Sequence, residues 1–222
     1  MSIEPDLLPT GFMWLALCLA FIPIVLAIYR INWRALQQKP YLQHIFYIVC
    51  ISLAVLWSIR AGLSSGLGIH FMGLTAATLL MGWPLALLAG ALSLLLVSFM
   101  GLESFMAFGV NFGISILLPI CTSWWILKWV QHALPANPFV YIFLCGFFNG
   151  AIAILAVALC TSLMVWGLDI YSASKVYHEY LMYLPLMLFP EAFVNGMVVA
   201  GVMGTKPELL SSFDVDKYFS DE

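Results

Sequence analysis

Residues 70–100 read HFMGLTAATLLMGWPLALLAGALSLLLVSFM, an apolar run of 31 residues that contains no Asp, Glu, Lys or Arg. A straight α-helix of this length would measure about 46 Å, whereas the hydrocarbon core of a bilayer is about 30 Å thick. Gly82, Trp83 and Pro84 interrupt the run, and a proline and its preceding residue both disfavour continuous helix. We therefore expect a short helix at 70–82, a tight turn, and a further helix at 84–100.

The rest of the chain repeats this apolar character on both sides of the run. Hydrophobic residues make up 64% of the 222 residues and charged residues 9%, whereas soluble domains hold about 45–50% and about 25%. Backbone polar groups inside a bilayer must be paired within the segment, which favours helices. The sequence predicts an all-α integral membrane protein with a seven-transmembrane-helix bundle as a single domain, 1–205, and a short acidic cytoplasmic tail, 206–222. The five other helices are expected at 9–29, 41–59, 105–130, 139–167 and 180–204.

The basic residues near the helix ends predict the orientation of the bundle, because Lys and Arg accumulate on the cytoplasmic side. One side of the predicted topology holds Arg60 and Lys175 only. The other side holds six basic residues, namely Arg30, Arg34, Lys39, Lys128, Lys206 and Lys217. This excess predicts an external N-terminus and a cytoplasmic C-terminus.

Ionisable or strongly polar residues inside a membrane bundle are costly and mark candidate functional positions. His70 follows a Gly/Ser-rich stretch, 62–69, that favours a loop dipping into the bundle from outside. Its imidazole can face a cavity, or it can be satisfied by a carbonyl or a water. Glu191, inside the last helix, must be neutral, paired or beside water, so coupling, structural hydrogen bonding and ligand contact all stay open. Asn111 and Gly109 suggest close packing, with the Asn111 amide bonded to neighbouring backbone.

Several motifs that mark soluble enzymes are absent from the sequence. It lacks a phosphate-binding G-x-x-x-x-G-K-[ST] loop, an H-E-x-x-H pair and a dinucleotide fingerprint. We therefore expect neither an enzyme nor a chain that uses ATP by itself. The net charge of −3 gives no reason to expect nucleic acid as a partner.

Four segments, which together span most of the chain and follow one another in the family's order, resemble the cobalt/nickel energy-coupling-factor permeases of the CbiM/NikM type. Residues 68–84, GIHFMGLTAATLLMGWP, are similar to the family signature G-H-L-L-G-…-A-x-x-L-G-P-W. Residues 108–113, FGVNFG, resemble A-L-G-x-N-x-x-N. Leu184-Pro185-Leu186 with Glu191 and Asn195 resembles H-x-P-L-…-E-G-…-T. Residues 1–9, MSIEPDLLP, resemble M-H-I-x-E-G-F-L-P.

The resemblance implies the substrate-binding membrane component of an importer in the bacterial inner membrane. Its partners would be a membrane coupling (T) subunit and ABC-type ATPases, and its cargo Co²⁺, Ni²⁺ or another divalent transition-metal ion, with no cofactor of its own. In the family the ion is held outside by the terminal amine, the backbone nitrogen and imidazole of the second residue, and the histidine that matches His70. An all-nitrogen, roughly planar set suits Ni(II), Cu(II) or low-spin Co(II).

The sequence departs from the family pattern at the second residue, where Ser2 replaces the histidine and one nitrogen donor is lost. A small second residue also favours removal of Met1, which would shift the amine by one position. The histidine of the last-helix pattern is missing too, since Tyr183 precedes Leu184. The candidate metal ligands are His70, Met1 and Ser2, with supporting candidates Glu4, Asp6, Asn111 and Glu191.

Two functions therefore stay open. The first is ion capture on the outer face for uptake that depends on partner ATPases. The alternative is a CbiM-like structural or assembly subunit of another membrane complex that no longer transports, and Ser2 is its main support. Ion binding that depends on His70 separates the two.

Overall fold

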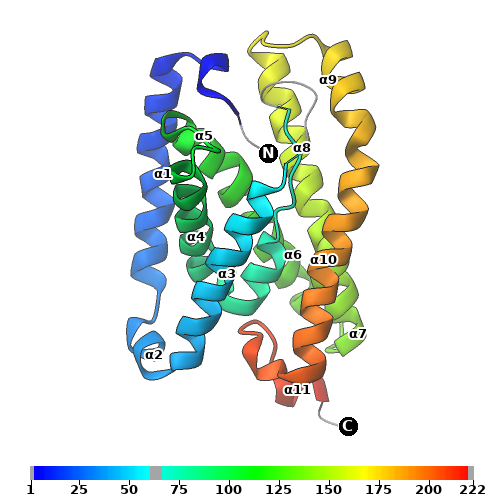
Figure 1. The fold of residues 1–222 in the computed structure, drawn as a ribbon. Coiled ribbons are helices and arrows are strands. Elements are labelled where there is room, and N and C mark those ends of the chain that lie inside the picture. The colour runs from blue at the N-terminus through cyan, green and yellow to red at the C-terminus, as the bar shows by residue number, and fades with distance from the viewer. Residues whose placement is uncertain (1–2, 61–66, 220–222) are drawn as a thin grey trace.

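Helices, and no β-strands, form the regular structure of residues 3–60 and 67–219, which are the residues described by this computed structural model (Figure 1). The first half of the chain forms η1 (Pro5–Leu7), α1 (Thr10–Arg30), α2 (Trp33–Gln38), α3 (Pro40–Ser58), α4 (Leu74–Phe99), η2 (Phe105–Ala107) and α5 (Phe108–Phe112). The second half forms η3 (Gly113–Leu117), α6 (Leu118–Ala133), α7 (Pro138–Val140), η4 (Tyr141–Phe148), α8 (Asn149–Gly167), α9 (Ala173–Glu179), η5 (Leu181–Tyr183), α10 (Leu184–Thr205), η6 (Pro207–Leu209) and α11 (Val215–Phe219).

The helices join into long apolar segments, as a multi-pass membrane protein requires. Within the described residues, six segments are long and apolar enough to cross a membrane: Thr10–Arg30, Pro40–Ser58, Leu74–Phe99, Phe105–Ala133, Pro138–Gly167 and Ala173–Thr205. The predicted all-helical membrane class is confirmed. The number of candidate membrane-spanning segments is six, whereas the sequence predicted seven transmembrane helices. The external position of the N-terminus stays a prediction.

The difference in count lies in α4, which the sequence predicted as two helices with a turn at Gly82–Pro84. The α4 backbone breaks at Gly82, whose φ of 77° and ψ of 162° are not helical. A Cβ added to Gly90 would lie 3.5 Å from the Leu74 side chain, although a straight helix would separate these residues by about 24 Å. The two halves of α4 therefore lie side by side. The first half is about 12 Å long, too short to cross a bilayer alone.

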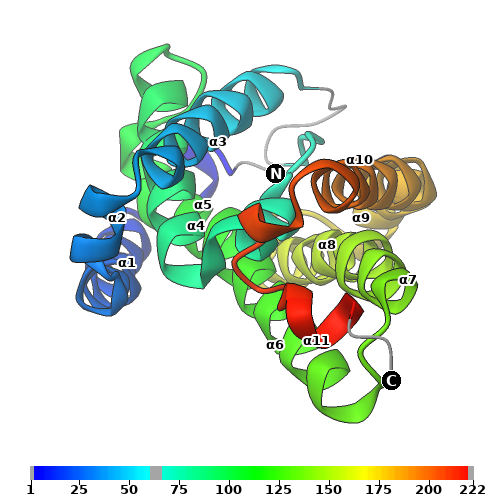
Figure 2. The same ribbon diagram turned by 90° about the horizontal axis from the view of Figure 1, so that it is seen from below.

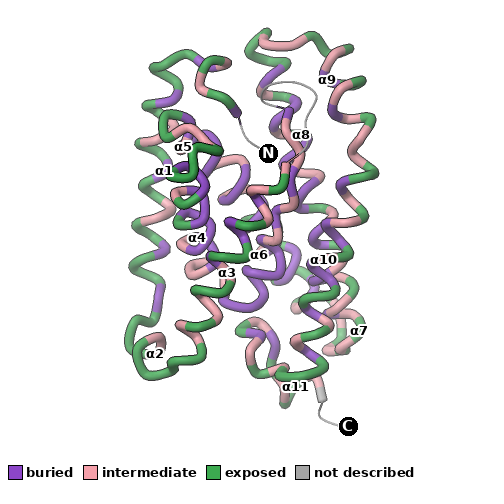
Figure 3. Tube along the Cα trace, viewed as in Figure 1, coloured by how far each residue is buried: buried purple, intermediate pink, exposed green. Residues whose placement is uncertain are grey.

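Apolar side chains form both the core of the bundle and much of its outer surface, and a smaller set of polar residues is buried among them. In Figure 3 buried residues follow α4, α6 and α8 through the middle, whereas the outer α1 is largely exposed. The exposed residues of α1 include large apolar side chains such as Trp14, Leu19 and Phe21. In water such a continuous apolar surface would be unfavourable, so lipid is the environment that this surface fits.

Residues 206–218, from the predicted acidic tail, fold back against the bundle (Figure 2). The Ser211 N–H donates to Leu80 O at 3.1 Å, and the Ser212 hydroxyl donates to Leu79 O at 2.8 Å. These carbonyls end the first half of α4, where the break at Gly82 leaves them without helical partners. Phe213 packs on Tyr141 with ring centroids 5.0 Å apart. The tail therefore caps the broken helix, while residues 220–222 lie outside the described residues.

Two neighbouring serines of the tail allow this cap to be tested. The Ser212 hydroxyl contacts both Leu79 O and the Tyr141 hydroxyl, whereas the Ser211 hydroxyl lies 3.5 Å from Leu79 O. We expect Ser212→Ala to lower the free energy of unfolding by about 1–2 kcal/mol, because Leu79 O loses a hydroxyl donor and the Tyr141 hydroxyl loses its acceptor. Ser211→Ala should change it by less than about 0.5 kcal/mol. Thermal unfolding in detergent measures both, and equal effects would contradict the capping role.

Candidate functional site

His70 lies in the extended segment 67–73 that leads into α4, and only 6% of the surface of His70 is exposed. The His70 and Trp57 rings have centroids 6.0 Å apart. His70 Nδ1 lies 3.0 Å from Phe71 O, and because a carbonyl only accepts, Nδ1 is the donor there and Nε2 carries the lone pair of the neutral ring. Burial lowers the pKa of His70 well below its ordinary value. The imidazole is therefore neutral at physiological pH, which is the form that binds metal ions.

Glu191 of α10 holds the segment that carries His70. Its Oε2 accepts from the Met72 N–H and its Oε1 from the Gly73 N–H, both at 2.8 Å. Trp57 of α3 also holds this segment, since its Nε1 donates to Met72 O at 3.1 Å. Non-helical backbone is tolerated at membrane depth only where its polar groups are paired inside protein. Glu191 and Trp57 supply that pairing for the His70 segment.

Asn195, one turn after Glu191 on α10, completes the cap of α4. Its Oδ1 accepts from the Ala76 N–H at 2.8 Å, and its Nδ2 donates to Glu191 Oε1 at 2.7 Å. The Asn195 oxygen therefore meets an N–H group in the first turn of α4, and the Glu191 carboxylate lies just before the helix, where the dipole favours negative charge. Gly73 has a φ of 66°, a left-handed conformation that favours glycine. The turn lets the backbone face α10 immediately before the helix begins.

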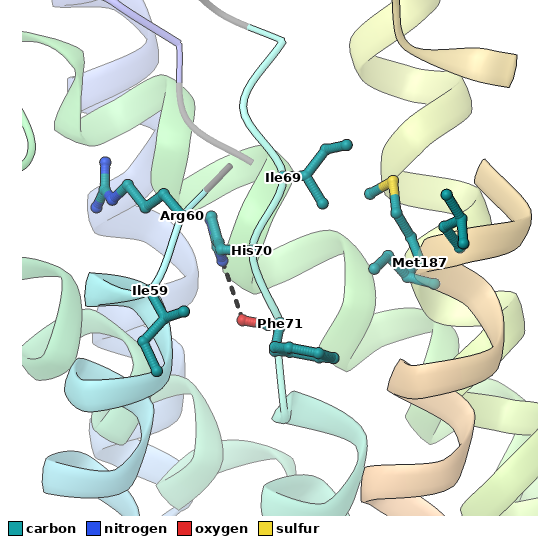
Figure 4. Close-up of a pocket in the computed structure, with 8 residues that line it drawn as sticks. Ile59, Arg60, Ile69, His70, Phe71 and Met187 are labelled. Atoms are coloured by element: carbon teal, nitrogen blue, oxygen red, sulfur yellow. Dashed lines mark hydrogen bonds between the residues drawn. The ribbon is translucent and has the colours of Figure 1, made fainter. Parts of the chain in front are cut away.

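A pocket of about 170 Å³ opens beside His70. Figure 4 shows its walls, which come from the end of α3, the 67–73 segment, α8 and α10. Most of the lining is apolar, and the nitrogen-bearing side chains are His70 and Arg60. The complete lining consists of Ile59, Arg60, Ile69, His70, Phe71, Ile154, Leu186 and Met187.

Asn111 binds the segment before α1. Its Oδ1 accepts from the Ile3 N–H at 2.8 Å, and its Nδ2 donates to Ile3 O at 3.3 Å. Ile3 is 2% exposed, and in Figure 1 this segment turns from the top of α1 toward the middle of the bundle. The predicted bond between the Asn111 amide and backbone is confirmed, although the partner lies 108 residues away.

The structure brings together some of the predicted site residues and not others. Met1, Ser2 and the stretch 61–66 lie outside the described residues. Glu4 and Asp6 are exposed, while the side chains of Asn111 and Glu191 are engaged with backbone groups. Among residues 3–60 and 67–219, no group of three or more His, Cys, Asp or Glu is arranged to hold a metal ion. The described part of the site therefore offers one imidazole donor, His70.

Sequence reasoning missed the supporting residues. It gave Trp57 no role in the site and used Arg60 only as a charge on one side of the membrane, yet both contact the His70 segment or its pocket. One signal was present in the sequence: Glu191 and Asn195 are four residues apart and so lie on one face of a helix. Two polar side chains on one face can bond the same neighbouring segment.

The fold defines the chain as a multi-pass membrane protein. Its candidate site is the buried imidazole of His70, on the segment 67–73 that α3 and α10 hold in place. The family model of the cobalt uptake substrate-specific transmembrane region, CbiM, matches residues 2–209. The chain belongs to this family, which confirms the family predicted from its motifs.

Two solved structures share the fold. One, described as a truncated transition metal transporter, aligns with a TM-score of 0.75 at 16% identity and covers 92% of this chain and 99% of that chain. A second, described as a transition metal transporter, aligns with a TM-score of 0.75 at 17% identity and covers 92% and 93%. At this identity the likeness shows the fold alone. No curated protein sequence matches the chain.

Proposed function

We propose that the chain is the substrate-binding membrane component of an importer for a divalent transition-metal ion, and that it captures the ion on the outer face. Membership of a cobalt uptake family supports uptake as the process. The observation that carries ion binding is His70, a buried neutral imidazole on a segment that α3 and α10 hold in place. A neutral imidazole suits Co²⁺, Ni²⁺ and similar borderline ions.

The energy for transport comes from partners in this proposal. The sequence has no phosphate-binding loop, so a separate coupling (T) subunit and ABC-type ATPases would drive release of the ion into the cell. The location would be the inner membrane of a bacterium. Met1 or its successor would contribute the terminal amine, and Ser2 reduces the number of nitrogen donors by one. Glu4 and Asp6, exposed on the same segment, add oxygen donors that suit a less planar site.

The test is titration of the purified protein with Ni²⁺, Co²⁺, Cu²⁺ and Zn²⁺, together with elemental analysis of the protein as isolated. We expect one ion to bind and His70→Ala to reduce its affinity by at least a hundredfold, because the described part of the site supplies no second imidazole. His178→Ala is the matched control, since His178 is exposed and bonded within α9 to Ser174 O. It should bind as the wild type does.

Undiminished affinity in His70→Ala would contradict the proposal. If neither protein binds any of the four ions, the alternative is favoured: a CbiM-like structural or assembly subunit without transport. Ser2, in place of the family's second-position histidine, is the feature that supports this alternative.

A further inference from the structure

A chain of polar contacts connects the segment before α1 to the wall of the His70 pocket. Asn111 bonds both backbone groups of Ile3. Its Nδ2 also donates to Glu103 Oε2 at 3.0 Å, and Glu103 Oε1 lies 2.8 Å from Arg60 Nη1. Arg60 lines the pocket that contains His70. Three successive contacts therefore join Ile3 to the pocket, and the residues come from four separate parts of the chain.

Glu103 favours the same orientation of the Asn111 amide as the two backbone groups of Ile3 do. An amide has a donor side and an acceptor side, and either can be turned toward a given partner. A carboxylate only accepts, so Glu103 requires the Nδ2 side of Asn111 to face it. The Oδ1 side then faces the Ile3 N–H at 2.8 Å. The reversed amide would place Nδ2 against that N–H, donor against donor, and would release the segment.

Arg60 in turn fixes Glu103. Its Nε donates to Trp57 O at 2.9 Å and its Nη1 to Leu102 O at 2.8 Å. The guanidinium is thus held by the end of α3 and by the turn that contains Glu103. The Glu103 side chain is 6% exposed and that of Arg60 is 23% exposed, so the pair is shielded from water.

We propose that Glu103 is a positioning residue for ion binding: held by Arg60, it orients Asn111, which clamps the N-terminal segment relative to the His70 pocket. This inference rests on the proposed function, because it assigns a role in the same site. Groups that orient metal ligands commonly change metal affinity by 10–100-fold when they are removed. Glu103→Gln should therefore weaken ion binding by that factor.

Two measurements on the full chain in detergent test the proposal. The first is hydrogen–deuterium exchange of the N-terminal peptide that contains Ile3, without metal, and the second is titration with the four ions. Glu103→Gln should speed exchange at Ile3 at least tenfold and weaken ion binding 10–100-fold. Glu179→Gln is the matched control, because Glu179 forms a more exposed pair with Lys175 at 3.9 Å. It should leave both quantities unchanged.

The double variant Arg60→Glu, Glu103→Arg separates orientation of the amide from simple ion pairing. It can restore an ion pair between the two positions, so the melting temperature should recover relative to either single change. Arginine only donates, so Asn111 should turn its Oδ1 to residue 103 and exchange at Ile3 should stay fast. Recovery of slow exchange together with stability would overturn the proposal.

The outcomes distinguish this inference from the proposed function. Unchanged exchange at Ile3 in Glu103→Gln overturns the inference whatever the ions do. Faster exchange with unchanged affinity overturns the positioning role and leaves the proposed function standing. If the wild type binds none of the four ions, the proposed function fails, and exchange at Ile3 alone then decides whether Glu103 clamps the segment.

Discussion

Replacement of Glu191 with alanine is expected to destabilise the protein by on the order of 3–5 kcal/mol. The substitution removes the acceptor of three donors: the Met72 N–H, the Gly73 N–H and Asn195 Nδ2. Glu191 is 2% exposed, so water cannot easily replace it, and each buried donor left unpaired costs about 1–3 kcal/mol. The segment 67–73 would lose its attachment to α10, and ion binding at His70 should fall with stability.

A graded series makes this prediction specific. Glu191→Gln keeps one acceptor oxygen but presents an amide NH₂ to the second backbone N–H, so about half of the loss is expected. Glu208→Ala is the control, because Glu208 is exposed in η6 and should change the stability by less than about 0.5 kcal/mol. Thermal unfolding followed by tryptophan fluorescence suits this measurement, since Trp57 contacts the same segment. An alanine variant as stable as the Glu208 control would refute the capping role of Glu191.

The membrane class and the family were predictable because the signals that reveal them are local in sequence. Runs of apolar residues mark bilayer-crossing helices through their length. The Gly82–Pro84 interruption in the run 70–100 marked the break in α4. The signature around His70 and the order of the other motifs indicated the family, which the match over residues 2–209 confirms.

The contacts that shape the site were not predictable, because they join residues far apart in the chain. Met72 and Glu191 are 119 residues apart, and Ile3 and Asn111 are 108 apart. Hydropathy treats Glu191 as an unfavourable charge and Ile3 as one more apolar residue. Only the three-dimensional arrangement shows that the carboxylate caps a helix or that the isoleucine backbone is clamped. The docking of Ser212 on Leu79 was missed for the same reason.

Gly109 of α5 packs directly against the backbone of α1, and Gly109→Ala is expected to cost about 3 kcal/mol. A Cβ at this position would overlap the backbone of Leu17 and would lie 2.5 Å from the carbonyl carbon of Ala16. Backbone atoms cannot move aside as the end of a side chain can, so α1 or α5 must shift. Asn111 lies two residues further along α5, so the shift should also loosen its hold on Ile3.

Gly113→Ala provides the matched control for this substitution. Gly113 follows α5 by one residue, and a Cβ there meets no atom within 4 Å. Alanine at this position removes backbone freedom from the unfolded chain without a clash, so stability should stay equal or rise by up to about 1 kcal/mol. Melting temperatures and exchange at Ile3 for the two variants give the comparison. If the two alanines behave alike, contact between the α1 and α5 backbones at Gly109 does not position the N-terminal segment, and the clamp at Asn111 acts independently of helix packing.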